Sequence, residues 1–144
     1  MWRGVVRVLI RAVDAVLVPV YRVTDGRIGA HGRGQDMLLL ETVGRRTGRR
    51  RTHALAYIRE GERYVVCASF YGAPRHPAWY DNLVSRPEAR VQVGARRFAV
   101  QAHPARGEER ERLWALLVRE HAVFESYQRA TTRVLPLVVL SPRR

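Results

Sequence analysis

Residues 67–83 read CASFYGAPRHPAWYDNL, and this stretch decides the fold because it joins a strand to a helix through a turn rich in polar and aromatic side chains. It follows the β-branched run at residues 64–66, crosses a turn at residues 72–74 and continues as a helix after Pro77. Proline suits the first helical position, because its ring fixes φ and its missing N–H would have no partner there. Backbone N–H groups at such a connection can bind an anion. We therefore expect a binding site, with these polar and aromatic candidates: Ser69, Tyr71, Arg75, His76, Trp79, Tyr80 and Asn82.

A second stretch, GRRTGRRRT at residues 44–52, lies between two strand-like runs at residues 37–43 and 52–58. This arginine loop contains two glycines, five arginines and two threonines. Such a loop suits phosphate or carboxylate, because flexible backbone donors combine with bidentate guanidinium groups. The alternative is a solvated hairpin whose charges oppose edge-to-edge pairing. Composition leaves both interpretations open.

Together the two stretches resemble motifs of the deazaflavin-dependent nitroreductase family, small oxidoreductases that use coenzyme F420. The family motifs are close to GRK[ST]G-x-x-R and ASKGGA-x-x-PxWYxNL, and the resemblance continues through residues 87–93, 107–110 and 127–142. It implies a split β-barrel, of the kind that binds FMN, with the deazaflavin held in a groove. With an N-terminal amphipathic helix and peripheral helices, the expected fold class is α+β.

Length and charge restrict the possibilities. The 144 residues predict one domain, with an amphipathic helix at residues 1–20, a linker at 21–35 and the barrel at 36–144. A net charge of +13 implies an anionic partner. Under the resemblance, that partner is F420 itself, with its phosphodiester and oligoglutamate tail. One cysteine cannot form an internal disulfide and no Cys/His spacing indicates a metal, so we expect a cytoplasmic protein without a metal site.

Residues 2–18 have the pattern of an amphipathic helix that Pro19 is expected to end. The apolar positions at helical spacing are Val6, Leu9, Ile10, Val13, Val16, Leu17 and Val20. Charged residues interrupt every apolar run, which excludes a transmembrane span and a signal peptide. Two compatible interpretations remain. The helix covers one end of the barrel, which is favoured because most amphipathic helices bury their apolar face, or it lies peripherally on the anionic inner face of the cell membrane.

The remaining sequence predicts five or six strands with helices at the periphery, as in a small barrel. Strands are expected at residues 37–43, 52–59, 63–69, 90–93, 97–102 and 134–140, and helices after Pro77 and at 107–121 and 123–129. Four glycines predict a flexible linker over residues 24–34. Within helix 107–121 we expect an i,i+4 pair between Glu108 and Arg112 and a buried face formed by Leu113, Leu116 and Leu117.

The resemblance assigns site residues by position. The phosphate and tail would be held by Arg45, Arg46, Thr47, Gly48, Arg51, Thr52 and His53. The ring and ribityl chain would contact Cys67, Ala68, Ser69, Ala78, Trp79, Tyr80 and Asn82. The candidate catalytic residues are Ser69, as a hydrogen-bond donor near the reacting ring, and Tyr127, on the acceptor side. Alternatively, Trp79 and Tyr80 belong to the core. Cys67 has no basic neighbour in sequence, so its thiol is not expected to be reactive.

Three positions depart from the family pattern. Phe70 replaces the usual lysine and removes a positive charge from the expected groove. His121 and Phe124 stand where nitro-reducing members carry tyrosines, so reduction of nitroimidazoles is not expected. The predicted activity is an F420H2-dependent reductase that transfers a hydride to an electron-poor small molecule: a quinone first, otherwise a nitro compound or an activated enone. The alternatives are a non-catalytic F420-binding protein and a basic module for nucleic acid or membrane. No nucleic-acid partner is expected, since the arginine loop lacks interleaved aromatic residues.

Overall fold

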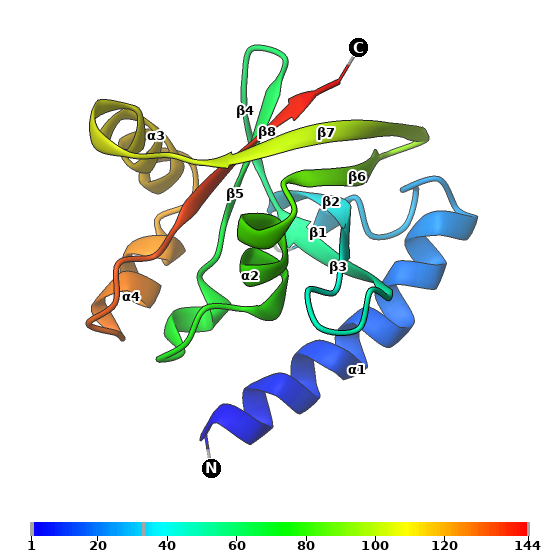
Figure 1. Cartoon of the computed structure of the whole chain (residues 1–144), viewed down its shortest axis with the longest axis horizontal. Coiled ribbons are helices and arrows are strands. Elements are labelled where there is room, and N and C mark those ends of the chain that lie inside the picture. Colours follow the sequence, from blue (N-terminus) through cyan, green and yellow to red (C-terminus); the bar gives the residue numbers. More distant parts are fainter. Residues whose placement is uncertain (1, 33, 144) are drawn as a thin grey trace.

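An antiparallel sheet curls around an apolar core, and helices cover its outer side and one end (Figure 1). The computed structural model describes residues 2–32 and 34–143. In chain order the elements are α1 (Trp2–Val23), β1 (His31–Gly32), β2 (Gln35–Val43), β3 (Arg50–Ala56), β4 (Ile58–Glu60), β5 (Arg63–Cys67), the 3-10 turn η1 (Phe70–Gly72), α2 (Ala78–Ser85), β6 (Glu88–Val93), β7 (Arg96–Pro104), α3 (Gly107–Glu120), α4 (Val123–Arg129) and β8 (Leu137–Pro142).

The strands follow the order β1-β2-β6-β7-β8-β5-β4, and β3 pairs with β2 outside this path. Every pair is antiparallel, and β5 joins the C-terminal strand β8 with Val65 opposite Val139. Because side chains alternate along a strand, β5 contributes to two cores. Tyr64 and Val66 point into the barrel with Leu38. Val65 points outward against α3 and α4. The central strands are therefore buried on both sides, as predicted for residues 37–43.

Several predicted boundaries shift. The described residues form eight strands rather than five or six. One reason is that the predicted strand 52–59 divides at Tyr57, whose N–H bonds the carbonyl of Asp36 at 3.0 Å, so that β3 pairs with β2 and β4 with β5. Pro77 is the N-cap of α2 rather than its first residue, with extended backbone angles of φ −65° and ψ 150°. Arg112 pairs with Glu60 across elements instead of with Glu108.

The predicted end of the first helix at Pro19 is wrong, since α1 continues to Val23 with Pro19 inside it. Proline removes one backbone hydrogen bond, but burial of the following turn stabilises the helix against that loss. The side chain of Tyr21 is 0% exposed, and it packs with Val18 and Leu39.

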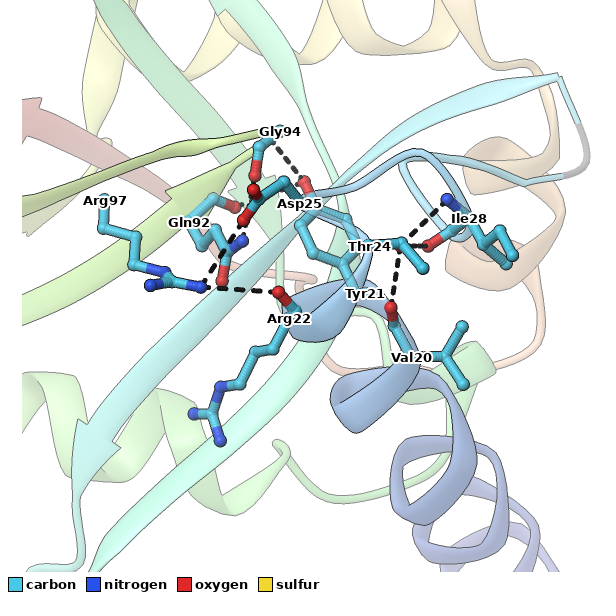
Figure 2. A network of polar contacts seen from close by, with 9 residues as sticks. All are labelled: Val20, Tyr21, Arg22, Thr24, Asp25, Ile28, Gln92, Gly94 and Arg97. Carbon is cyan, nitrogen blue, oxygen red and sulfur yellow. Dashed lines mark hydrogen bonds and ion pairs between the residues drawn. The ribbon is translucent and has the colours of Figure 1, made fainter.

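The predicted flexible linker is instead a set of hydrogen-bonded turns around the Tyr21 hydroxyl (Figure 2). That hydroxyl donates to the carbonyl of Met37 at 3.0 Å and accepts from the backbone N–H of Gly94 at 2.8 Å. The polypeptide at Gly26 comes so close to the β6–β7 hairpin that a Cβ there would lie 2.7 Å from the Cα of Gly94. Arg97 adds an ion pair to Asp25 at 3.6 Å, visible in the same view. Residues 21–26 thus fasten α1 to the sheet.

The favoured interpretation of α1, with its apolar face on the barrel, is wrong for most of the helix. Five apolar side chains are between 55% and 68% exposed: Val5, Val8, Leu9, Val13 and Val16. On the side facing β3, Asp14 accepts hydrogen bonds from the Ala54 N–H at 3.2 Å and contacts His53 Nδ1 at 2.7 Å. Over residues 5–16 the helix therefore turns these apolar side chains away from the sheet, and its apolar packing on the sheet comes from Val18 and Tyr21 near its C-terminal end. Within the described ranges, no helix is both long and apolar enough to cross a membrane.

Candidate functional site

The arginine loop and the 67–83 stretch meet through one buried side chain, Asn82. The β2–β3 hairpin ends in the loop, where Gly44 and Gly48 close the turn with backbone hydrogen bonds of 2.7 and 2.8 Å. Asn82 is 5% exposed; its oxygen accepts from the backbone N–H of Arg45 at 3.1 Å, and its amide nitrogen donates to the Thr42 hydroxyl at 3.1 Å. The two predicted halves of the site are therefore adjacent, and the buried side chain of Asn82 connects them through its hydrogen bonds.

The guanidinium groups of the loop face solvent. Arg45 lies 3.7 Å from Asp81, and Arg50 lies 3.8 Å from Glu41. Three further arginines, Arg46, Arg49 and Arg51, form no ion pair with any residue in the described part of the chain. Unpaired cations on a glycine-bracketed loop fit a multiply charged anion, because phosphate and carboxylate each accept charge-assisted hydrogen bonds. Thr47 closes the loop internally, since its hydroxyl accepts from the Arg49 N–H at 3.2 Å.

Two residues predicted to bind the cofactor face α1 rather than α2. The Thr52 hydroxyl accepts from the Arg22 side chain at 2.8 Å, and His53 contacts Asp14. Both residues follow the loop on β3, at positions that pack against the helix. The structure therefore brings Arg45 to Asn82, and it places Thr52 and His53 at the α1 contact.

The turn segment at residues 67–77 is rigid and partly strained. Cys67 and Ala68 are buried, and burial raises the pKa of the Cys67 thiol to about 12 against weaker opposing effects of Arg110 and Arg133. The thiol stays protonated at neutral pH and is a packing group. Phe70 and Tyr71 have positive φ angles of 45° and 54°, which non-glycine residues rarely adopt. Such strain persists only where the surroundings hold the backbone in place.

Arg133, which the sequence analysis did not single out, holds this segment. From the loop between α4 and β8, its guanidinium donates to the carbonyl oxygens of Ser69 at 2.6 Å, Ala73 at 2.7 Å and Ala68 at 3.1 Å. A fourth bond, of 2.9 Å, reaches Nδ1 of His76. The contacts span 57 to 65 residues of sequence, so no local pattern indicates them.

His76 is kept neutral by its position. Burial first, and then the positive charge of Arg133, lower the pKa of His76, while Asp81 raises it. Since Nδ1 accepts from Arg133, the ring proton resides on Nε2. The ring packs edge-on against Tyr80 at 4.9 Å between centroids, which links the turn segment to α2.

Helix α4 forms the other side of the turn. A Cβ at Gly72 would lie 2.6 Å from the carbonyl oxygen of Tyr127, so only glycine permits this approach. The Tyr127 ring stacks edge-on with Tyr71 at 5.6 Å and with Phe124 at 5.6 Å. Tyr127 is thus beside the predicted cofactor turn. Phe124 is 6% exposed in the outer core, so its side chain does not face an acceptor.

On α2 the predicted residues divide. Trp79 is 4% exposed and packs in the barrel core with Leu38 and Val66, which agrees with the alternative interpretation of this residue. Ala78 is exposed and Tyr80 is half-buried beside His76. The polar and exposed groups around Asn82 and Ser69, rather than the indole of Trp79, form the accessible surface of the site.

Fold and site together define a split-barrel protein with a basic loop beside a fixed turn. A model of the F420H(2)-dependent quinone reductase family matches residues 15–142, and the chain belongs to this family. It is 40% identical over 139 residues to an F420H(2)-dependent quinone reductase of Mycobacterium tuberculosis strain H37Rv, covering 94% of this chain and 91% of that relative.

Solved structures agree. An F420-H2 dependent reductase, FDR-A, superposes with a TM-score of 0.67 at 33% identity, covering 73% of this chain and 93% of that one. A second structure, described as a domain-swapped dimer, has a TM-score of 0.70 at 31% identity over 90% of this chain and 99% of that one. The predicted family, split-barrel fold, oxidoreductase class and F420 as the cofactor are confirmed.

Proposed function

We propose that this protein binds reduced F420 and passes a hydride to a quinone. One observation carries the proposal. The 44–52 loop, with its arginines that form no ion pair, lies beside the turn that Arg133 holds, and Asn82 connects the two. The bound coenzyme supplies the two electrons and one proton of the hydride, and the quinone gains a second proton to become a quinol, matched by the proton that oxidation of the coenzyme releases. The protein supplies binding and orientation.

In this proposal Arg45, Arg46 and Arg51 hold the phosphodiester and tail carboxylates of the coenzyme. Their side chains are exposed at the end of the hairpin, where guanidinium groups can form two parallel bonds to each anion. The backbone N–H groups of the loop add donors, and Gly48, with φ of 68°, gives the loop a conformation that glycine adopts without strain.

In the same proposal Ser69 donates a hydrogen bond to the bound ring. Its carbonyl is fixed by Arg133, and its side chain forms no capping bond to the η1 turn that it precedes. The hydroxyl therefore remains available to donate to a ligand, and the backbone that carries it is held in place by Arg133. Tyr127 packs on Tyr71 from α4, and in this proposal it supports the turn from the side of that helix.

The experiment is a pair of titrations with F420 and FMN, followed by anaerobic oxidation of F420H2 with menadione. We expect F420 to bind more tightly than FMN, because its acidic tail meets the arginine loop, and menadione to oxidise the reduced coenzyme. Tighter binding of FMN would refute the cofactor assignment. F420 binding without turnover of any quinone would leave the carrier alternative.

We also propose that α1 lies on an anionic membrane surface. Its outward side presents Val5, Leu9 and Val16, while the exposed Arg11 can reach lipid headgroups. Vesicles with anionic lipid should co-sediment the protein, and vesicles of neutral lipid should do so less. Leu9→Asp with Val13→Asp should abolish this without changing the unfolding temperature, since both side chains are already exposed. The alternative is that the apolar side contacts a second copy of the chain. In that case the unmodified protein would form a dimer and not bind vesicles, and the double variant would be a monomer.

A further inference from the structure

A cleft of about 260 Å³ separates the first turns of α1 from the turn segment. Its lining comes from both sides: Gly4, Arg7, Phe70, Ala73, Pro74 and Arg75. Phe70 directly follows Ser69, the residue proposed to contact the coenzyme ring. The cleft is therefore next to the proposed reaction site, and it is separate from the arginine loop.

The walls of the cleft combine flat apolar groups with two cations. Phe70, Ala73 and Pro74 form the apolar side. Arg7 and Arg75 form no ion pair with residues among those described, so both charges remain available to a ligand. A Cβ added at Gly4 would meet nothing within 4 Å, which shows that the space in front of this helical glycine is open.

The apolar wall has a fixed shape. The positive φ of Phe70 is held from behind, where Arg133 binds the carbonyls of Ser69 and Ala73 on either side of it. Gly72 packs on α4 between them. A strained aromatic residue that two elements hold in place is a common feature of ligand sites. The backbone that carries the Phe70 ring into the cleft is thus held in one conformation.

We propose that this cleft is the acceptor subsite, and that it takes a planar quinone ring. Phe70 contacts the face of the ring, and Arg7 and Arg75 stabilise the negative charge that develops on a quinone oxygen during reduction. The proposal deepens the proposed function and rests on it. An apolar wall with two cations suits a flat molecule with oxygens at its edge, whereas a chain of carboxylates would leave the apolar wall unused.

The first test fills the cleft with Gly4→Trp, and Val5→Trp is the matched control. Val5 is the next residue of the same turn and its side chain is 57% exposed on the outward side. Equilibrium dialysis of menadione without coenzyme should show binding weakened roughly tenfold or more for Gly4→Trp, as blocked pockets do, and unchanged for Val5→Trp. The KM for menadione should rise in parallel, and the dissociation constant of F420 should stay the same.

The second test removes a positive charge from the lining of the cleft. Arg75→Ala should lower kcat with menadione by up to roughly two to three powers of ten, as loss of one charge-stabilising donor does, and Arg75→Lys should recover part of it. Arg106→Ala, an exposed arginine at the start of α3, is the control for net charge. Phe70→Ala should weaken menadione binding while circular dichroism and the unfolding temperature confirm a folded protein.

The outcomes separate this inference from the proposed function. Weaker F420 binding by Gly4→Trp, with unchanged dialysis of menadione, would place the acidic tail of the coenzyme in the cleft and overturn the inference. Equal menadione binding by Gly4→Trp, Phe70→Ala and the unmodified protein would also overturn it. If the unmodified protein failed to bind F420, the proposed function would fall, and the dialysis would still report whether the cleft binds a quinone.

Discussion

The arginine loop and the turn segment lie on either side of Asn82 and differ in how they are held. The loop side chains at residues 45–50 are all exposed, and its attachment to the rest of the protein is a few bonds, chiefly Arg45 N–H to Asn82. The turn segment has buried residues, a strained backbone and four hydrogen bonds from Arg133. Attraction between charges tolerates small displacements, whereas hydride transfer depends on sub-ångström positioning. The protein thus combines an adaptable grip on an anion with a fixed surface for a ring.

The largest effect should follow from breaking the rigid side. Arg133→Ala leaves the carbonyls of Ala68 and Ala73 without their donor, while the Ser69 carbonyl keeps the Gly72 N–H; the cost is roughly 1–3 kcal/mol for each buried acceptor left unpaired. We expect a lower free energy of unfolding in urea and a marked loss of kcat. Arg133→Lys keeps the charge but not the planar guanidinium group, so its stability and kcat should lie between those of Arg133→Ala and the unmodified protein. Wild-type stability in Arg133→Ala would mean that the turn is held by other contacts.

The adaptable side should behave differently. Arg45→Ala combined with Arg51→Ala should weaken F420 binding by roughly 1.5–3 kcal/mol for each charged hydrogen bond lost, with little change in unfolding temperature. Binding by the unmodified protein should also weaken as salt rises, because the loop charges are exposed. The control is Arg106→Ala with Arg119→Ala, which removes the same charge from both ends of α3. An equal loss in the control would assign the effect to net charge.

Asn82 connects the two regions, and its replacement should affect both moderately. Asn82→Ala removes the bonds to Thr42 and to the Arg45 N–H, with a loss of roughly 1–3 kcal/mol of stability from the buried groups left unpaired. Hydrogen exchange of the Arg45 amide should accelerate, while the amides of residues 68–73 keep their protection. Faster exchange throughout the turn segment would show that the loop and the turn are not held independently.

The smallest effect concerns pH. The pKa of His76 is lowered in the folded protein, so the unfolded state takes up a proton at a higher pH than the folded state does. That contribution to stability is present above the ordinary value of 6.5 and is lost as pH falls through the folded pKa. His76→Gln, whose oxygen can still accept from Arg133, should reduce the difference in unfolding temperature between pH 7.5 and 5.5 (about these values). An identical pH dependence in the variant would assign the titration to other groups.

Local chemistry explains which predictions succeed. The helix after Pro77 and the strands predicted at residues 63–69, 90–93 and 97–102 depend on a few adjacent residues, and the structure has all of them, with shifted ends. The linker prediction failed because glycine content indicates freedom in an isolated chain. Here Gly26 serves a close approach to Gly94 instead. The prediction that Pro19 ends the helix also failed, because burial of Tyr21 outweighs the local tendency of proline to break a helix.

By itself the sequence determined the family and the split-barrel class, through the resemblance of its two motifs, and the basic loop, because motifs and charge are properties of neighbouring residues. Only the tertiary structure decided that Trp79 lies in the core, that the apolar side of α1 faces away from the sheet, and that Arg133 reaches the turn segment. Periodicity shows that a helix has two faces, but it does not show which face meets the protein. Contacts across 57 residues or more depend on how the sheet closes, with β8 beside β5, and no short stretch of sequence contains that information.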